Sequence, residues 1–168
     1  MAEYLGARIV VPPNDEPHRE YLTENASGKL SVQRCTACGH LRYPVLTACP
    51  DCLDLRYTWA ALSGKGTIHS YYVVPHAINP VFREIVPYVV VLVELDEARE
   101  EYGPGRALRV IGNVLRPDGT PEAAANVAIG KRVHVRLVDI GDGWAIPQWE
   151  LSDEPPEGTP WQAPGPAL

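Results

Sequence analysis

Four cysteines in two pairs constrain this chain more than any other feature of its sequence. Cys35 and Cys38 form one C-x2-C pair, Cys49 and Cys52 form the second, and ten residues separate the pairs. Two intervening residues let both sulfurs of a pair face one ion, and Gly39 allows the positive φ that closes such a turn. Two turns of this kind supply four sulfurs in a tetrahedron, the geometry of structural zinc. We therefore predict a structural Zn²⁺ held by all four thiolates.

Three other interpretations of these cysteines need to be weighed against zinc. Disulfides form in oxidising compartments, and nothing in the sequence indicates export to one. Mononuclear iron, as in rubredoxin, uses the same two pairs, so the sequence alone separates zinc from iron poorly. His40 is an alternative ligand, but with four cysteines present we expect it to be an exposed turn residue. Four thiolates leave no open position for a reacting molecule, so we expect the site to be structural.

Composition favours strands and argues against two classes of function. The 17 prolines and 14 glycines favour short strands and turns over long helices. The net charge of −6 opposes binding to the phosphate backbone of nucleic acids. A local basic patch could still bind phosphates despite this net charge. The longest apolar stretch, 85–95, is far shorter than the ~20 residues that span a bilayer. With no signal-peptide pattern at the N-terminus, we expect a cytoplasmic protein without a membrane partner.

The remaining pattern predicts a mainly β fold. Capping residues at 14–15 and Gly28 bracket a short helix, and 29–34 alternates like a strand leading into the first cysteine pair. Further strands are expected at 56–62, 67–75, 88–95, 107–115, 132–139 and 144–151, with a turn at 63–66 and a helical turn at 123–128. The last five strands fit an OB-fold barrel, whereas a seven-stranded sandwich needs about two more. The predicted fold is an N-terminal helix, a rubredoxin-like zinc ribbon and a five-stranded OB-fold barrel.

We divide the chain into four parts on these grounds. Residues 1–29 form a leader with the short helix, 30–56 the zinc ribbon, 57–152 the OB-fold domain and 153–168 a proline-rich tail. The tail has little to bury except Trp161. It is either disordered or a segment that docks on a partner through that indole.

A set of short motifs follows one another in a specific order along the chain. They are G-K-L…Q-R-C-x-x-C-G from Gly28, Y-P at Tyr43, C-P-x-C at Cys49, Trp59, S-G-x-G-x-I-x-S from Ser63, P-Y-V-V…V-E-L-D from Pro87 and I-G-K-R-V-x-V from Ile129. Over about residues 16–150 this order resembles the bacterial and archaeal family of rubredoxin-like zinc ribbon plus OB-fold proteins, long known as a domain of unknown function. The sequence departs from the family pattern between Asp96 and Gly130 and in the tail.

The resemblance implies a supporting role in acyl-CoA metabolism. Members of the family are similar to accessory subunits or fused domains of thiolase-fold enzymes: thiolases, acyltransferases and sterol side-chain aldolases. Others accompany MaoC-type hydratases. The small protein would help to hold acyl-CoA in a hetero-oligomer, and the partner would supply the catalytic residues. We find no nucleophile–base arrangement in the sequence itself. We therefore do not expect the chain to catalyse a reaction alone, although the sequence does not decide this question.

Two cations are candidates for contacts with the phosphates of CoA. Lys65 lies between Gly64 and Gly66 at a predicted corner of the barrel, and Arg42 lies beside the ribbon. For each of them, a solvated side chain without a ligand is the more common interpretation of such a position. The alternative function is a nucleic-acid-binding zinc ribbon and OB-fold module, which would need a basic face with exposed aromatic residues. A rubredoxin-like electron carrier is a third possibility, and the red colour of an iron tetrathiolate would reveal it.

Overall fold

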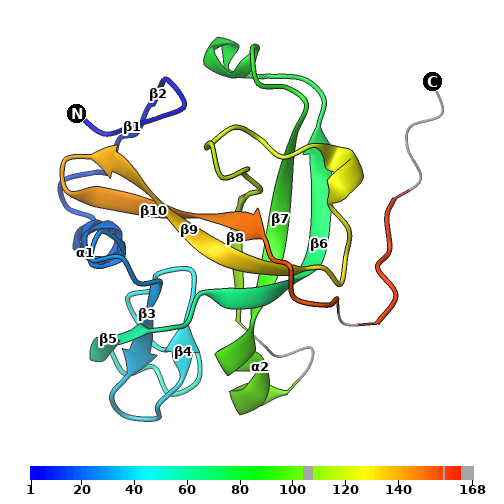
Figure 1. Ribbon diagram of the computed structural model, residues 1–168. Coiled ribbons are helices and arrows are strands. Elements are labelled where there is room, and N and C mark those ends of the chain that lie inside the picture. Colours follow the sequence, from blue (N-terminus) through cyan, green and yellow to red (C-terminus); the bar gives the residue numbers. More distant parts are fainter. Residues whose placement is uncertain (104–107, 157, 164–168) are drawn as a thin grey trace.

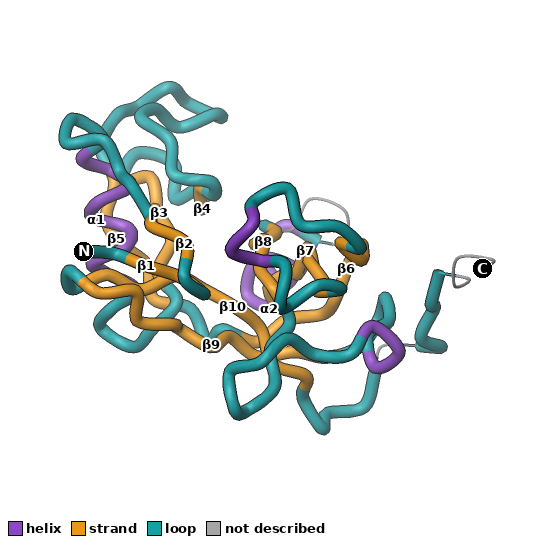
Figure 2. The backbone as a smooth tube through the Cα atoms, turned by 90° about the horizontal axis from the view of Figure 1, so that it is seen from above, coloured by secondary structure: helices purple, strands orange, loops and turns teal. Residues whose placement is uncertain are grey.

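The chain folds into a small ribbon sheet set against a barrel. The structure is a computed structural model, and it describes residues 1–103, 108–156 and 158–163. A three-stranded sheet and helix α1 lie on one side of the molecule, and the barrel extends from helix α1 to the other side (Figures 1 and 2). No helix within the described ranges is long and apolar enough to cross a bilayer.

The N-terminal part contains a short hairpin and the expected helix. Strands β1 (Glu3–Tyr4) and β2 (Ala7–Arg8) pair with each other. Helix α1 (Glu16–Asn25) follows, with Pro17 in its first turn. Tyr21 and Leu22 are buried against the rest of the protein, as expected for its apolar face. The Asn25 side chain donates to Tyr21 O and accepts from Ser31 N, which ties the end of the helix to the ribbon.

The ribbon sheet has the strand order β4-β3-β5. Its strands are β3 (Ser31–Cys35), β4 (Leu41–Arg42) and β5 (Tyr57–Ala61). Because β5 pairs with β3 over its whole length, the ribbon sheet extends to Ala61, beyond the division that we placed after residue 56.

Five strands form the predicted barrel. They are β6 (Lys65–Val74), β7 (Tyr88–Leu95), β8 (Arg109–Asn113), β9 (Arg132–Gly141) and β10 (Trp144–Leu151). Their order is β10-β9-β6-β7-β8, and a parallel bridge between Val114 and Trp149 closes the ring. Leu115 N donates to Trp149 O at 2.8 Å beside this bridge. Strand β7 has the predicted bounds, and its alternate valines fill the core together with Ile68, Val110 and Trp149.

Gly66 explains the close pairing at the start of the barrel. We expected a turn over 63–66, but β6 already begins at Lys65. A Cβ on Gly66 would lie 2.5 Å from Glu94 O and 2.6 Å from Val93 Cγ1. This glycine therefore serves the close approach of β6 to β7, whereas Gly64, just before β6, is the residue of this segment with a positive φ, at +76°.

Three short elements complete the fold. Helix α2 (Asp96–Tyr102) follows β7, and the sequence analysis did not anticipate it. Its residues are mostly charged, and only Ala98 is buried, so the segment carries little apolar periodicity. The 3₁₀ helix η1 (Pro80–Phe82) lies in the long β6–β7 connection, and η2 (Ala124–Asn126) confirms the helical turn expected before β9. Residue 107, expected to start β8, lies outside the described ranges.

The tail contacts the barrel of its own chain. Ile129 N donates to Trp161 O at 2.8 Å, and Trp161 N donates to Ile129 O at 3.1 Å. Gln162 Nε2 donates to the carbonyls of Ala125 and Val127, on either side of the end of η2. The indole of Trp161 remains 55% exposed. Docking of this indole on a partner stays a prediction, and residues 157 and 164–168 lie outside the described ranges.

Candidate metal centre

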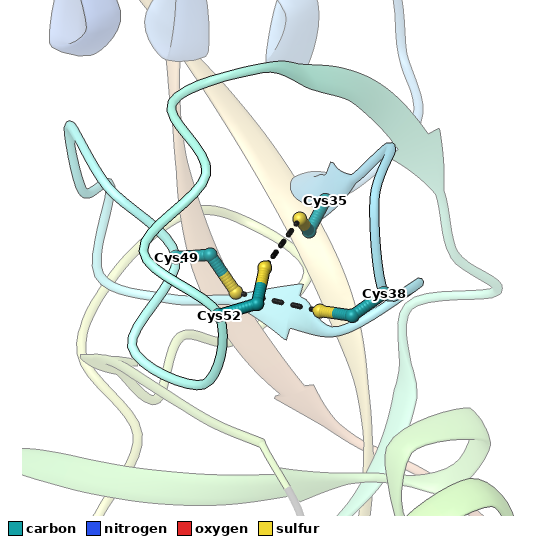
Figure 3. Close-up of side chains that lie close together, drawn as sticks. All are labelled: Cys35, Cys38, Cys49 and Cys52. Atoms are coloured by element: carbon teal, nitrogen blue, oxygen red, sulfur yellow. Dashed lines mark hydrogen bonds between the residues drawn. The ribbon is translucent and has the colours of Figure 1, made fainter.

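The four cysteines converge from two loops of the ribbon. Cys35 ends β3, Cys38 lies in the turn to β4, and Cys49 and Cys52 lie in the loop between β4 and β5. All four sulfurs lie within 4.8 Å of one another. The Cys35–Cys52 and Cys38–Cys49 Sγ distances are both 3.6 Å (Figure 3).

These distances fit a tetrahedral zinc site. A tetrahedron with Zn–S bonds of about 2.3 Å has edges of about 3.8 Å. Disulfide sulfurs lie only about 2.0 Å apart, and all four cysteines here are free. The donor set therefore fits one Zn²⁺ with every coordination position taken by a thiolate. A metal bound there would cross-link the two loops.

The two loops that carry the cysteines have the same backbone hydrogen bonds. In the first knuckle (residues 35–40), Gly39 N donates to Cys35 O, and Cys35 N donates to His40 O. In the second knuckle (residues 49–54), Leu53 N donates to Cys49 O, and Cys49 N donates to Asp54 O. Both knuckles need a positive φ after the second cysteine, +80° at Gly39 and +62° at Leu53. The sequence signalled the first of these turns but not the second, because leucine rarely adopts this conformation.

Backbone amides and a neighbouring arginine shape the electrostatics of the centre. The backbone N–H of Cys38, the largest contribution, lowers the pKa of the Cys35 thiol to about 6. A hydrogen bond from the His40 backbone also lowers the pKa of the Cys38 thiol, but burial and the neighbouring sulfurs outweigh it and raise this pKa to about 12. At the second knuckle, the Arg56 guanidinium donates to the Asp54 carboxylate at 2.8 and 3.1 Å. This hydrogen bonding lowers the pKa of Asp54 to about 2 and keeps it charged.

His40 lies beside the metal centre rather than in it. Its Nδ1 is 2.8 Å from Asp51 Oδ2, so it links the first knuckle to the second. Its ring also contacts Tyr102 of α2, with centroids 5.3 Å apart. Among the described residues, the four cysteines are the only group whose ligand atoms converge on one point. The expectation that His40 is not a ligand therefore agrees with the geometry, although the ring is partly buried rather than exposed.

Arg42 and Lys65 occupy very different surroundings. Arg42 is 1% exposed, inside the ribbon, so a contact with CoA stays a prediction that would require the side chain to leave this position. Lys65 is exposed at the start of β6, and its Nζ lies 2.5 Å from Glu154 Oε1 in the tail. A ligand phosphate at Lys65 would compete with that carboxylate, and this contact also stays a prediction.

A groove between the ribbon and the barrel was not predicted from the sequence. It measures about 340 Å³. Tyr43 of the ribbon, Leu92 of the barrel and Tyr102 of α2 line it together with the buried Leu41 and Leu108, and His40 and Arg109 add polar groups. Arg109 donates to Glu94 at 3.1 and 3.2 Å, which fixes its guanidinium. No local pattern marks this site, because its walls come from distant segments that meet only in the fold.

Comparisons with known proteins agree with this architecture. Residues 26–57 match the model for "ChsH2, rubredoxin-like zinc ribbon domain", and residues 59–138 match that for "ChsH2, C-terminal OB-fold domain". Among solved structures, an "Ltp2-ChsH2(DUF35) aldolase" chain superposes with a TM-score of 0.66 at 26% identity. That match covers 84% of this chain and 98% of the other.

Two relatives of known sequence show the family of the chain. A "Probable enoyl-CoA hydratase alpha subunit" of Thermomonospora curvata is 42% identical over 69 residues, which are 41% of this chain but only 21% of that protein. A "DUF35 domain-containing scaffold protein" of Methanocaldococcus jannaschii is 32% identical over 117 residues, covering 67% of this chain and 72% of the relative. The chain therefore belongs to the DUF35 family, in which a rubredoxin-like zinc ribbon precedes an OB-fold domain.

Proposed function

We propose that this protein is a non-catalytic, acyl-CoA-binding accessory subunit. Its catalytic partner would be a thiolase-fold enzyme (a thiolase, an acyltransferase or a sterol side-chain aldolase) or a MaoC-type hydratase. The observation that carries the proposal is the match to 98% of a chain in the Ltp2–ChsH2 aldolase, with ribbon and barrel in the same order. Relatives named as a scaffold protein and as a hydratase subunit support the same role.

The groove between ribbon and barrel supports acyl-CoA as the ligand. Its volume of about 340 Å³ lies in the range of small-molecule sites. The partly exposed side chains of Tyr43, Leu92 and Tyr102 suit pantetheine or an acyl chain. The Arg109 guanidinium, partly exposed and held by Glu94, would meet a phosphate or the thioester carbonyl.

A metal bound by the cysteines would stabilise the side of this groove that the ribbon forms. Leu41 and Tyr43 follow the first knuckle directly, and the Leu41 amide donates to the Tyr102 hydroxyl at 2.9 Å. A zinc ion bound by the four thiolates would fix the knuckle and, through it, the ribbon side of the groove. The chemistry that zinc supplies here is a structural cross-link.

Ligand binding tests the acyl-CoA part of the proposal. Isothermal titration of the zinc-loaded protein with a short acyl-CoA should show binding, and Arg109→Met should weaken it about tenfold, as expected for loss of one charge-assisted contact. Arg116→Met is the matched control, because this arginine is exposed outside the groove and pairs with Glu122. Equal affinities for both variants, or no binding by the wild type, would contradict the assignment of the groove.

Co-purification tests the partner independently. The tagged protein, expressed with a thiolase-fold enzyme or a MaoC-type hydratase from the same genome, should elute with one of them as a stable complex. The complex should show turnover that the small subunit alone lacks. If neither class of enzyme is retained, the accessory role fails even where acyl-CoA binds.

A further inference from the structure

Arg42 carries a buried positive charge without a carboxylate partner. The residue is 1% exposed. Its Nη2 donates to Arg56 O at 3.4 Å, whereas Nε and Nη1 are buried without a hydrogen-bond partner. None of the ion pairs formed by the described residues includes Arg42. A guanidinium in such a place needs a compensating negative charge, because removing it from water is costly.

The nearby side chains supply only part of that charge, because the Asp54 carboxylate interacts with the Arg42 guanidinium at a distance but makes no ion pair with it. The Arg42 guanidinium lies 5.0 Å from the centre of the Tyr57 ring, a cation–π contact that offsets only part of the desolvation. Asp54 is held by Arg56, and Glu20 Oε2 accepts a hydrogen bond from the Tyr57 hydroxyl at 2.7 Å. Both carboxylates are thus engaged with other groups.

The strand register places Arg42 next to the metal centre. Arg42 of β4 pairs with Gln33 of β3, and the neighbouring Cys35 N donates to His40 O at 2.9 Å. Arg42 and Cys35 are therefore diagonal neighbours on one face of the sheet, a spacing that a long side chain reaches. Arg56 O joins the two as well, because it accepts both from Arg42 Nη2 and from the Thr36 amide, at 3.4 and 3.3 Å.

Four thiolates around one Zn²⁺ leave two negative charges in excess. Cys38 and Cys52 are exposed to water, but Cys35 and Cys49 are buried on the side of the ribbon interior. We propose that the positive charge of Arg42 compensates the excess negative charge of the zinc tetrathiolate from inside the ribbon. This inference does not depend on acyl-CoA binding, and it gives the buried guanidinium an anionic partner in place of the carboxylate that it lacks.

Zinc affinity of the full chain, measured by competition with a chromophoric chelator, tests the inference. Arg42→Met keeps the length of the side chain without its charge, and it should weaken zinc binding about tenfold or more. Arg42→Lys keeps the charge and should stay within about threefold of the wild type. Lys29→Met, which removes an exposed cation just before β3 and outside both knuckles, should change the affinity little. Equal losses for Arg42→Met and Arg42→Lys, or no loss for Arg42→Met, would overturn the proposal.

A change in the charge of the centre separates electrostatics from packing. In a Cys38→His background the metal site loses one thiolate charge, so Arg42→Met should cost a clearly smaller factor in zinc affinity than in the wild type. The same factor in both backgrounds would show that Arg42 acts through packing and would refute the inference. If Arg42→Met does not fold in saturating zinc, Arg42→Gln takes its place in both backgrounds and is judged by the same criteria.

Discussion

The ribbon and the barrel hold together by different means, although they share one chain and touch each other. The barrel interior is filled by apolar side chains with no exposed surface: Ile68, Val89, Val91, Val93, Val110 and Trp149. The ribbon also buries Leu30, Val32 and Leu41 against the barrel, but Gln33 and Arg42 are buried in it as well. Its loops of residues 35–40 and 49–54 bury few apolar side chains. A region built in this way needs a cross-link, and the four cysteines provide the site for one.

Metal removal should produce the largest difference between the two regions. Structural zinc in small modules contributes on the order of 10–16 kcal/mol of apparent binding energy at neutral pH, which exceeds what the loops gain by burial. Chelation should therefore unfold residues 30–56 and leave the barrel folded. Hydrogen exchange followed by mass spectrometry should show protection lost in the ribbon and kept at β7. Protection that persists over 30–56 in the metal-free protein would show that the two regions are alike.

Truncation of Trp149 should destabilise the barrel and leave the ribbon unaffected. This indole is fully buried where β10 closes on the end of β8, so Trp149→Ala should lower the free energy of unfolding by about 3–5 kcal/mol. Denaturant unfolding with saturating zinc measures the loss, which should fall on the barrel while zinc affinity changes little. Trp161→Ala, at an exposed indole, is the matched control and should cost less than about 1 kcal/mol. Comparable costs for the two tryptophans would contradict the assignment of Trp149 to the core.

The two regions also differ in how far the sequence reveals them. Cys35, Cys38, Cys49 and Cys52 follow a local spacing rule, and β7 is almost continuously apolar, so the candidate metal site and the main strands could be predicted. Helix α2 could not, because its charged residues are ordered by contacts that lie far away in the sequence. The groove and the interior position of Arg42 also depend on tertiary packing. The sequence showed a cation near the ribbon but not the direction of its side chain.

Gly66→Ala should cost less than loss of the indole, because it adds one methyl group at the β6–β7 contact. The new Cβ would overlap Glu94 O and Val93 Cγ1, so the strands must separate slightly. We expect a loss of about 1–3 kcal/mol in the free energy of unfolding, confined to the barrel. Thermal unfolding of the zinc-loaded variant measures it. Gly39→Ala is the parallel test in the ribbon, where the added Cβ meets open space but the φ of +80° strains an alanine. This variant should weaken zinc binding and leave the stability of the barrel unchanged.

Leu53→Gly should have the smallest effect and the opposite sign. Leu53 closes the second knuckle at a φ of +62°, which costs a non-glycine residue about 1 kcal/mol, and its side chain is 75% exposed. Glycine relieves this strain but adds freedom to the unfolded chain, so the net gain should be a few tenths to about 1 kcal/mol. The gain should appear as tighter zinc binding in the chelator competition, since the two knuckles then close with the same backbone preference. Leu55→Gly is the control, because Leu55 is 62% exposed without a positive φ, and its replacement should bring no gain. If Leu53→Gly weakens zinc binding, the exposed leucine stabilises the knuckle through its side chain, and the ribbon depends on apolar contacts more than its few buried residues indicate.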